Sequence, residues 1–331
     1  MKESSIRPAE LFNRYLELSR QDIGRFFHER SDFRTVPCPA CGGERSEPGL
    51  EKFGFTYLIC SACGSLYLSP RPSPESLNRY YRESEAVKYW CTHFYKETAQ
   101  SRREKMFRPR AGLAAGIADR FGLARASAFA DIGAGYGIFL EEVEKLGRFG
   151  EIIAVEPSPQ LADKCRERGF KVIQKTIEEI SAGEVSAAFA TSFEVLEHLY
   201  SPEEFLAAVR RILLPRGLLL ITTLTVTGFD IQLLWEHSKS VYPPHHINLL
   251  SVEGMRRLFE RAGFEVLELS TPGELDVDIV RNTVKEDPSI VLPRFIRYLI
   301  DDSRAELGAS LQRFLQANLL SSHIRVIARK I

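Results

Sequence analysis

The stretch "FADIGAGYG", residues 129–137, decides the fold because it joins an apolar run to a glycine-rich turn and then to a helical pattern. The apolar run "ASAFADIG" has the composition of a buried strand, and "YGIFLEEVEKLG" has apolar residues at helical spacing. Glycines at such a turn let the backbone approach a ligand closely, and the first N–H groups of the following helix can face an anionic group. The stretch therefore predicts a strand–turn–helix unit that holds a cofactor.

Strand and helix patterns alternate from about residue 111 to the C-terminus, which is typical of a doubly wound α/β sheet. A helix start is marked where Ser201 precedes Pro202 and Glu204 in the pattern of a capping box. Residues 272–320 have a mostly helical pattern that is too long for a hairpin turn, which predicts a helical lobe inserted before the last strand. The predicted strands after the first one are 151–158, 170–174, 185–192, 216–224, 264–270 and 322–330.

The glycine pattern bears on the choice between two cofactors. A dinucleotide site would have the spacing G-x-G-x-x-G, whereas Gly137 follows Gly135 by two positions and Asp131 precedes the turn. Glu156 ends the second predicted strand, where its carboxylate can accept hydrogen bonds from both hydroxyls of a ribose. Both cofactors need such an acid, so Glu156 alone leaves the choice open.

Three motifs in order decide the cofactor: "DIGAGYG", "IIAVEPS" and "FATSFEVLEHLYSPEEFLAAVRRILLPRGLLLITT". Together they resemble the class I S-adenosylmethionine-dependent methyltransferases, in particular the ubiquinone-type O-methyltransferases, over about residues 111–270 and the final strand. The resemblance implies a Rossmann-like α/β sheet of seven strands with the last strand antiparallel. It also implies that S-adenosylmethionine binds over the carboxyl ends of the first strands.

The resemblance implies a set of cofactor-binding residues at the strand ends. Asp131 and the glycines of the turn would line the methionine part, and Glu156 would bind the ribose. Ile177 follows the third strand, where it would form a wall for the adenine. The residues after the fourth strand would lie where the family brings the methyl group to its acceptor. The complete predicted set is Asp131, Gly133, Gly135, Gly137, Glu156, Ile177, Ser192 and Phe193.

Two C-x-x-C pairs lie near the N-terminus, with 18 residues between them. In a chain without a secretion signal, such pairs indicate metal binding rather than disulfides. Two knuckles with this spacing bring four thiolates to the corners of a tetrahedron, as structural zinc requires. The alternative to a zinc site is four unligated thiols, but so short a segment has too little hydrophobic core to be stable without a metal or a covalent cross-link. The predicted zinc ligands are Cys38, Cys41, Cys60 and Cys63.

The chain divides by pattern into four parts. Residues 1–33 predict an amphipathic helix, 34–73 a zinc ribbon, 74–110 an aromatic helical connector, and 111–331 the α/β domain with its lobe. The ribbon ahead of such a domain is similar to the zinc-binding module of the sugar C-methyltransferases of deoxysugar pathways. This chain departs from them because it has no room for their further C-terminal α/β domain.

Histidines after the fourth and fifth predicted strands are the candidate catalytic residues, because a group with a pKa near neutrality can take a proton from the acceptor. His198 lies just past the fourth strand, and His245 and His246 lie in the loop after the fifth. In the sugar C-methyltransferases, histidines at similar positions act as or near the base. We expect His198 and His246 on opposite sides of one acceptor pocket.

Two other interpretations apply to the histidine loop. One of the adjacent histidines could brace the loop while the other faces water. A metal site built from His237, His245 and His246 is disfavoured, because adjacent histidines rarely both bind one ion and no carboxylate pair is placed by spacing.

Charge and hydropathy exclude several classes of partner. Lys plus Arg equals Asp plus Glu at 44 each, so bulk charge gives no support for a nucleic-acid partner. The N-terminal sequence lacks the apolar core of a signal peptide, and Pro215 and Arg216 interrupt the longest apolar stretch. A cytoplasmic protein without a membrane partner is therefore expected.

The sequence as a whole predicts a methyltransferase that acts on a small molecule, such as a sugar, a nucleotide-sugar or another secondary metabolite. An RNA-modifying methyltransferase is one alternative, since one group of ribosomal RNA methyltransferases also has an N-terminal cysteine cluster. The neutral charge of the ribbon disfavours it. A non-catalytic cofactor-binding protein is the other, and the intact glycines with Glu156 and His198 disfavour it.

Overall fold

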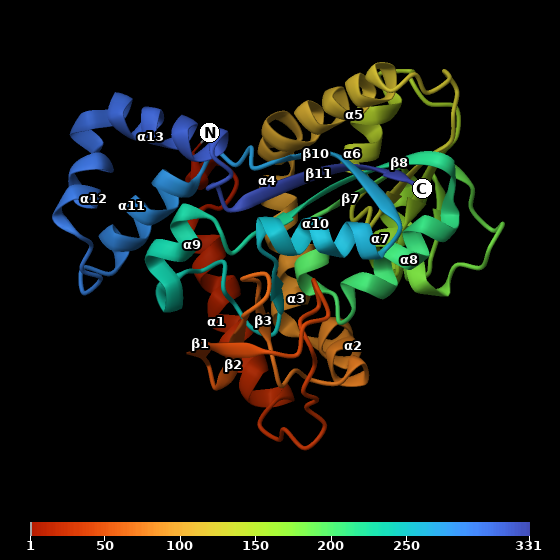
Figure 1. The fold of residues 1–331 in the computed structure, drawn as a ribbon. Helices are drawn as coiled ribbons and strands as arrows, with labels where there is room; N and C mark the ends of the chain where they lie inside the picture. Colours follow the sequence, from red (N-terminus) through yellow and green to blue (C-terminus); the bar gives the residue numbers. More distant parts are fainter. Residues whose placement is uncertain (1) are drawn as a thin grey trace.

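A seven-stranded sheet forms the centre of the structure, a computed structural model that describes residues 2–331 (Figure 1). Its strand order is β10-β11-β8-β7-β4-β5-β6, in which β4 to β8 are parallel and β11 is antiparallel to both of its neighbours. The predicted Rossmann-like sheet with an antiparallel last strand is confirmed. Its strands are β4 (Phe129–Ile132), β5 (Ile152–Val155), β6 (Lys171–Ile173), β7 (Ala187–Phe193), β8 (Leu213–Leu224), β10 (Phe264–Ser270) and β11 (His323–Lys330).

Helices cover both faces of this sheet, because successive side chains of a strand point to opposite sides. Leu219 of β8 belongs to the apolar cluster that includes residues of α8 and α10. Its neighbour Leu220 belongs to the cluster that includes residues of α5, α6 and α7. Buried on both sides, the strands are apolar almost throughout. The bounds of these helices are α5 (Arg108–Arg120), α6 (Ile138–Glu144), α7 (Pro159–Glu167), α8 (Pro202–Ile212) and α10 (Val252–Arg261).

The order of the strands locates the site. From β4 the chain proceeds to β5 and β6 on one side, and it then returns to β7 on the other side of β4. At such a switch point, a crevice forms outside the carboxyl ends of the parallel strands. The glycine turn directly follows β4, so it lies at this crevice.

A second sheet of four antiparallel strands, in the order β1-β2-β3-β9, contains the cysteine-rich segment. The strands β1 (Ser46–Lys52), β2 (Phe55–Cys60) and β3 (Leu66–Leu68) come from the predicted ribbon. The fourth strand, β9 (Asn248–Leu249), comes from the loop after β8 and begins two positions after His246. The C-terminal part of the chain therefore completes the ribbon sheet.

Helices of the N-terminal third link the ribbon sheet to the large sheet. The connector contains two π-helical segments, Trp90–Phe94 and Arg103–Phe107, one on each side of α4. The second segment continues directly into α5, so the expected boundary between residues 110 and 111 falls inside a helix. The other helices of this part are α1 (Ala9–Phe26), α2 (Pro74–Glu83), α3 (Glu85–Tyr89) and α4 (Tyr95–Arg102).

Helices also fill the segment between β10 and β11, and they form a lobe with an apolar cluster of its own. Figure 1 shows this lobe beside α9 at one end of the large sheet. The helices of the lobe are α11 (Asp276–Glu286), α12 (Arg294–Leu299) and α13 (Ala305–Ala317), and the neighbouring α9 spans Phe229–Leu234. Among residues 2–331, none of the helices combines the length and the apolar character that crossing a membrane requires.

Two leucines of β8 should differ strongly in their contribution to stability. Leu220 is fully buried, whereas Leu214 is 44% exposed. Leu220→Ala should lower the free energy of unfolding by about 2–5 kcal/mol, because it leaves a cavity in the core, and Leu214→Ala by about 0.5 kcal/mol. Urea unfolding followed by circular dichroism measures both changes, and equal effects would contradict the packing of β8.

Candidate active site

The turn after β4 needs its glycines for two physical reasons. Gly133, Gly135 and Gly137 have φ angles of +78°, +56° and +72°, in the left-handed region that side chains disfavour. A Cβ on Gly133 would also lie 2.7 Å from a methyl group of Val195. In contrast, a Cβ on Gly135 would meet nothing within 4 Å, so the space beside this glycine is open to a ligand.

Glu156, directly after β5, is held by the turn itself. Its Oε2 accepts a hydrogen bond from the Gly135 amide at 2.8 Å, and its Oε1 accepts one from the Ser158 amide at 3.0 Å. Burial raises the pKa of Glu156 to about 6. Asp131 lies in the same region and accepts a hydrogen bond from the Thr191 hydroxyl at 2.7 Å. The two carboxylates and the three glycines predicted from the sequence therefore meet at one edge of the sheet.

The connector lies against this edge. Tyr95 stacks on Tyr136 of the glycine turn, with ring centroids 4.4 Å apart and an interplanar angle of 15°. Burial raises the pKa of the Cys91 thiol to about 11, and the charge of Glu156 contributes in the same direction. Cys91 lies within the π-helical segment Trp90–Phe94 and Tyr95 directly follows it, and such segments occur often at functional sites. The contact of Tyr95 with the turn was not predicted, because nothing in the local pattern shows which face of the connector turns inward.

The other predicted cofactor residues lie in more closed surroundings. Ile177 is 3% exposed, in an apolar cluster that it shares with Val155. The Ser192 hydroxyl donates to the Ile132 carbonyl at 2.9 Å and so ties β7 to β4. The Phe193 ring packs edge-on against Phe139, with centroids 4.9 Å apart.

An ion-pair network that the sequence did not reveal lies beyond the end of β7. Glu194 contacts Arg110 and His323, each at 2.7 Å, and accepts a hydrogen bond from Thr222 at 2.6 Å. Although burial opposes it, the His323 and Arg110 charges hold the pKa of Glu194 well below its usual range. Glu194 has a φ of +57°, an unfavourable conformation that the network stabilises. Arg110 and His323 come from distant segments, so no local motif marks them.

His198 and His246 form the second part of the site. The Nδ1 of His198 lies 2.7 Å from the His245 carbonyl, and the Nδ1 of His246 lies 2.6 Å from the Ser240 carbonyl. A carbonyl oxygen can only accept, so each Nδ1 carries a proton and each neutral ring presents an unprotonated Nε2. Burial lowers the pKa of both histidines, that of His246 to about 3.

The expectation that these two histidines face each other across an acceptor pocket is wrong. Their ring centroids are 5.0 Å apart, which leaves no room for an acceptor between the rings. The alternative trio with His237 is not brought together either. His237 lies in a different cavity, where its Nε2 is 3.8 Å from Glu236.

His245 points away from this pair into an aromatic cage. Its Nε2 lies 2.6 Å from the Tyr80 hydroxyl, and the rings of Tyr15, Tyr81 and Tyr242 surround it with centroid distances from 5.6 to 6.4 Å. The side chain is buried. In this position His245 braces the loop, while its backbone carbonyl orients His198.

The ribbon sheet fixes the position of His246. The Leu68 amide donates to the Ile247 carbonyl at 2.9 Å, and the Tyr57 hydroxyl donates to the His246 carbonyl at 2.7 Å. Buried Arg71 donates to the Asn248 side chain at 3.1 Å. Three contacts therefore hold the histidine loop on the ribbon.

The cysteines of the ribbon have the arrangement that structural zinc requires. The sulfur atoms are 3.6 Å apart for Cys38 and Cys63 and 3.5 Å apart for Cys41 and Cys60, and all four lie within 4.8 Å of one another. In a tetrahedral zinc site with Zn–S bonds of about 2.3 Å, neighbouring sulfur atoms lie a little under ~4 Å apart. The four-thiolate donor set fits a zinc ribbon.

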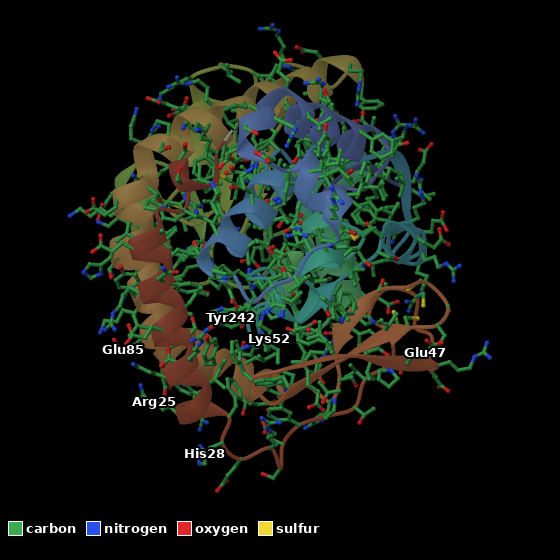
Figure 2. All side chains as sticks on the ribbon, turned by 90° about the vertical axis from the view of Figure 1, so that its left-hand side faces the viewer. Arg25, His28, Glu47, Lys52, Glu85 and Tyr242 are labelled. Atoms are coloured by element: carbon green, nitrogen blue, oxygen red, sulfur yellow. The ribbon has the colours of Figure 1, made fainter. Side chains whose placement is uncertain are left out.

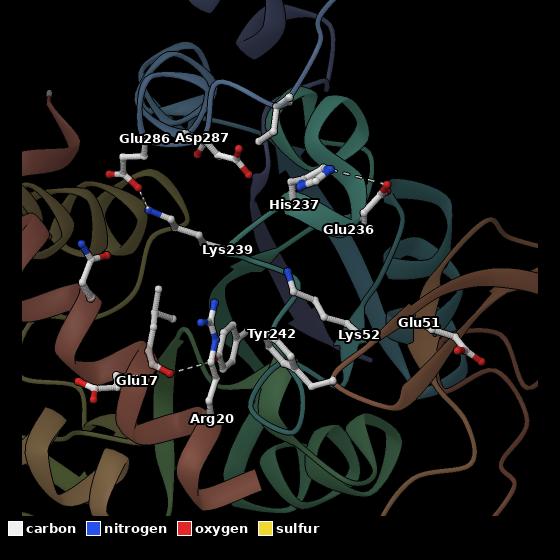
Figure 3. Close-up of a pocket in the computed structure, with 15 residues that line it drawn as sticks. Glu17, Arg20, Glu51, Lys52, Glu236, His237, Lys239, Tyr242, Glu286 and Asp287 are labelled. Carbon is white, nitrogen blue, oxygen red and sulfur yellow. Dashed lines mark hydrogen bonds and ion pairs between the residues drawn. The ribbon is translucent and has the colours of Figure 1, made fainter. Parts of the chain in front are cut away.

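A cavity of about 590 Å³ lies between α1, the β1–β2 hairpin and the helical lobe (Figure 3). Figure 2 shows Lys52 and Tyr242 in the region between α1 and the hairpin. Lys52 donates to the Ser238 carbonyl at 2.6 Å, and burial lowers its pKa to about 8. None of the predicted catalytic, cofactor-binding or zinc-binding residues lines this cavity.

Comparison with known proteins identifies the large sheet. A family model described as a methyltransferase domain matches residues 102–269, about half of the chain. The chain belongs to this methyltransferase-domain family. The ubiquinone biosynthesis O-methyltransferase of Xanthomonas oryzae pv. oryzae is 30% identical over 104 residues, which are 29% of this chain and 43% of that protein. The chain therefore matches less than half the length of this curated relative.

A solved structure gives the same result for the fold of the methyltransferase domain. The plantazolicin methyltransferase BpumL, in complex with a monoazolic desmethylPZN analog and SAH, has a TM-score of 0.50 and 14% identity. The similarity covers 77% of this chain and 93% of that chain. At this identity the similarity concerns the fold.

Loss of the ribbon metal should loosen the histidine loop of the methyltransferase domain. Cys60→Ser removes one of the four thiols whose arrangement fits zinc, so β3 should lose its fixed position and β9 its partner strand. Hydrogen exchange of peptides that cover residues 240–251 should become at least about tenfold faster. Cys91→Ser, outside the ribbon, is the control, and unchanged exchange in Cys60→Ser would separate the loop from the metal.

Proposed function

We propose that the chain is an S-adenosylmethionine-dependent methyltransferase that acts on a small molecule, such as a sugar, a nucleotide-sugar or another secondary metabolite. The observation that carries the proposal is the Glu156 carboxylate held against the Gly135 amide beside an open glycine turn. Membership of the methyltransferase-domain family supports the same cofactor. Glu156 fits this cofactor, because a buried carboxylate at a strand end can accept hydrogen bonds from two ribose hydroxyls.

Each part of the cofactor would have its own protein surface. Glu156 would hold the ribose, and Ile177 would lie beside the adenine. Asp131 with Gly133, Gly135 and Gly137 would surround the methionine part, and Ser192 and Phe193 would lie nearest the reactive end. When bound, the cofactor supplies a methyl group on a positively charged sulfur.

The protein then has three tasks: to align the acceptor with the methyl group, to exclude water and to assist loss of the acceptor's proton. The connector supports water exclusion, since Tyr95 already covers Tyr136 of the turn. The unprotonated Nε2 atoms of His198 and His246 are the groups that we propose assist deprotonation. His245 is assigned a bracing role.

The structure of the ribbon supports a small acceptor over an RNA. Its sheet is used to hold β9 and the histidine loop, so the cysteine unit has a role that needs no nucleic acid. The equal numbers of acidic and basic residues, 44 each, agree with this. The names of the similar proteins, one from ubiquinone biosynthesis and one from plantazolicin, also concern molecules other than RNA.

Binding of S-adenosylhomocysteine tests the cofactor. Isothermal titration calorimetry should give one saturable site per chain, and Glu156→Ala should weaken it by at least about tenfold, because two charge-assisted hydrogen bonds are lost. Glu151→Ala removes an exposed acid at the opposite end of β5, directly before Ile152, and should leave the affinity unchanged. Absence of binding to the wild-type chain would refute the proposed function.

The same binding should depend on pH. The pKa of Glu156 is raised to about 6, so its carboxylate is charged at pH 7 and largely protonated at pH 5. Because the charged form is the better acceptor, the dissociation constant for S-adenosylhomocysteine should rise by up to about tenfold between pH 7 and pH 5. Glu156→Gln should flatten this rise, and an unchanged pH profile in that variant would assign the effect to another group.

The histidines should affect turnover more than cofactor binding. With an acceptor in hand, His198→Ala and His246→Ala should each lower kcat by about 10²–10⁴-fold and leave the affinity for S-adenosylhomocysteine within about twofold. His237→Ala, in the separate cavity, is the control. Full turnover in both variants would remove the histidines from the reaction.

A further inference from the structure

A carboxylate and two imidazoles converge beside the end of β7. Glu197, His198 and His246 each place one metal-binding atom within 4.8 Å of the other two. Two histidines and one carboxylate form a donor set that binds divalent transition metals and leaves positions open on the ion. We propose that these three residues bind a divalent transition-metal ion, which holds an oxygen of the methyl acceptor.

The surroundings of the two histidines fit metal binding. Metal-binding histidines usually donate their second ring N–H to a carbonyl or a carboxylate, which fixes the ring and its tautomer. Here His198 donates from Nδ1 to the His245 carbonyl, and His246 donates from Nδ1 to the Ser240 carbonyl. Both rings are thereby set to present Nε2 as the ligand atom. The ribbon holds one of them in place, since Tyr57 donates to the His246 carbonyl.

Glu197 adds an independent observation. Its side chain is 2% exposed, and Oε2 accepts a hydrogen bond from the Thr223 hydroxyl at 2.6 Å. Within residues 2–331, no ion pair with a Lys, Arg or His side chain balances this carboxylate. A buried carboxylate without a cationic partner is costly, and a bound cation would compensate the cost.

The location suits an acceptor rather than the ribbon metal. Glu197 and His198 follow the carboxyl end of β7, and this end lies at the same sheet edge as Asp131 and Glu156, because the strands are parallel. The ribbon cysteines form a separate cluster whose donors are four thiolates. One chain would therefore hold two metal sites of different chemistry.

The ion would define the class of acceptor. Three protein ligands leave neighbouring positions that a hydroxyl and an adjacent oxygen of the acceptor can occupy together. Binding to the ion lowers the pKa of the hydroxyl, which releases its proton to water. His198 and His246 then assist deprotonation through the ion, because their Nε2 atoms are bound to it and cannot take the proton themselves. The oxygen then forms the bond to the methyl carbon while the carbon–sulfur bond breaks, and its electron pair stays on sulfur. The products are a methyl ether and S-adenosylhomocysteine, so this step rests on the proposed function.

Cobalt binding to the full-length chain, purified with its ribbon zinc, tests the inference. Titration calorimetry and visible spectra should show one saturable Co²⁺ site without the intense near-ultraviolet absorption of thiolate ligands. His246→Ala should weaken this binding by at least about tenfold, and His237→Ala should leave it unchanged. Glu197→Gln, which keeps the shape of the side chain, serves as the second variant, and the zinc content of each variant reports an intact ribbon.

The outcomes separate this inference from the proposed function. A wild-type chain that shows no saturable Co²⁺ binding, or variants that bind as tightly as the wild type, would overturn the metal site. If S-adenosylhomocysteine binds and Co²⁺ does not, the metal inference alone fails. If Co²⁺ binds as described and S-adenosylhomocysteine does not, the metal site stands and the methyltransferase function fails.

Discussion

The antiparallel pairing of β3 with β9 is the interaction on which the acceptor side of the site depends. β3 is short and belongs to a unit too small to hold a core of its own, so its position depends on the cysteine knuckles. β9 begins two positions after His246, and the contacts of Tyr57 and Arg71 reinforce the pairing. The cysteine knuckles thereby fix, through the β3–β9 pair, the position of the His246 imidazole beside β7.

The site is built from two halves with different supports. The cofactor half uses only the parallel strands: backbone conformation at the glycines, and a carboxylate that accepts from the turn. The acceptor half uses side chains from the end of β7, the loop after β8 and the connector, which are brought together by tertiary contacts. A single α/β domain would supply the first half, whereas the second needs the ribbon and the connector around it.

The sequence predicted the features that local pattern determines. Buried apolar strands, the glycine turn and the cysteine spacing each carry their own physical signature, so the sheet and the cysteine cluster were predictable. Contacts between residues distant in the chain have no such local signature. Nothing near Arg110 or His323 indicates that both approach Glu194. Nothing in "PPHHIN" shows that one histidine turns to Tyr80. The two histidines were placed too far apart for the same reason, since loop direction depends on β9.

The ribbon sheet has a consequence for the order of folding. Ser65 and Ser251 lie 186 positions apart in the chain, yet the Ser251 amide donates to the Ser65 hydroxyl at 3.0 Å, next to the β3–β9 pair. Contacts between such distant residues form late and slow folding. During synthesis the knuckles leave the ribosome long before β9 is made, so the edge of β3 that later pairs with β9 stays unpaired in the meantime. Early metal capture by the cysteines would keep this nascent edge ordered until its partner strand emerges.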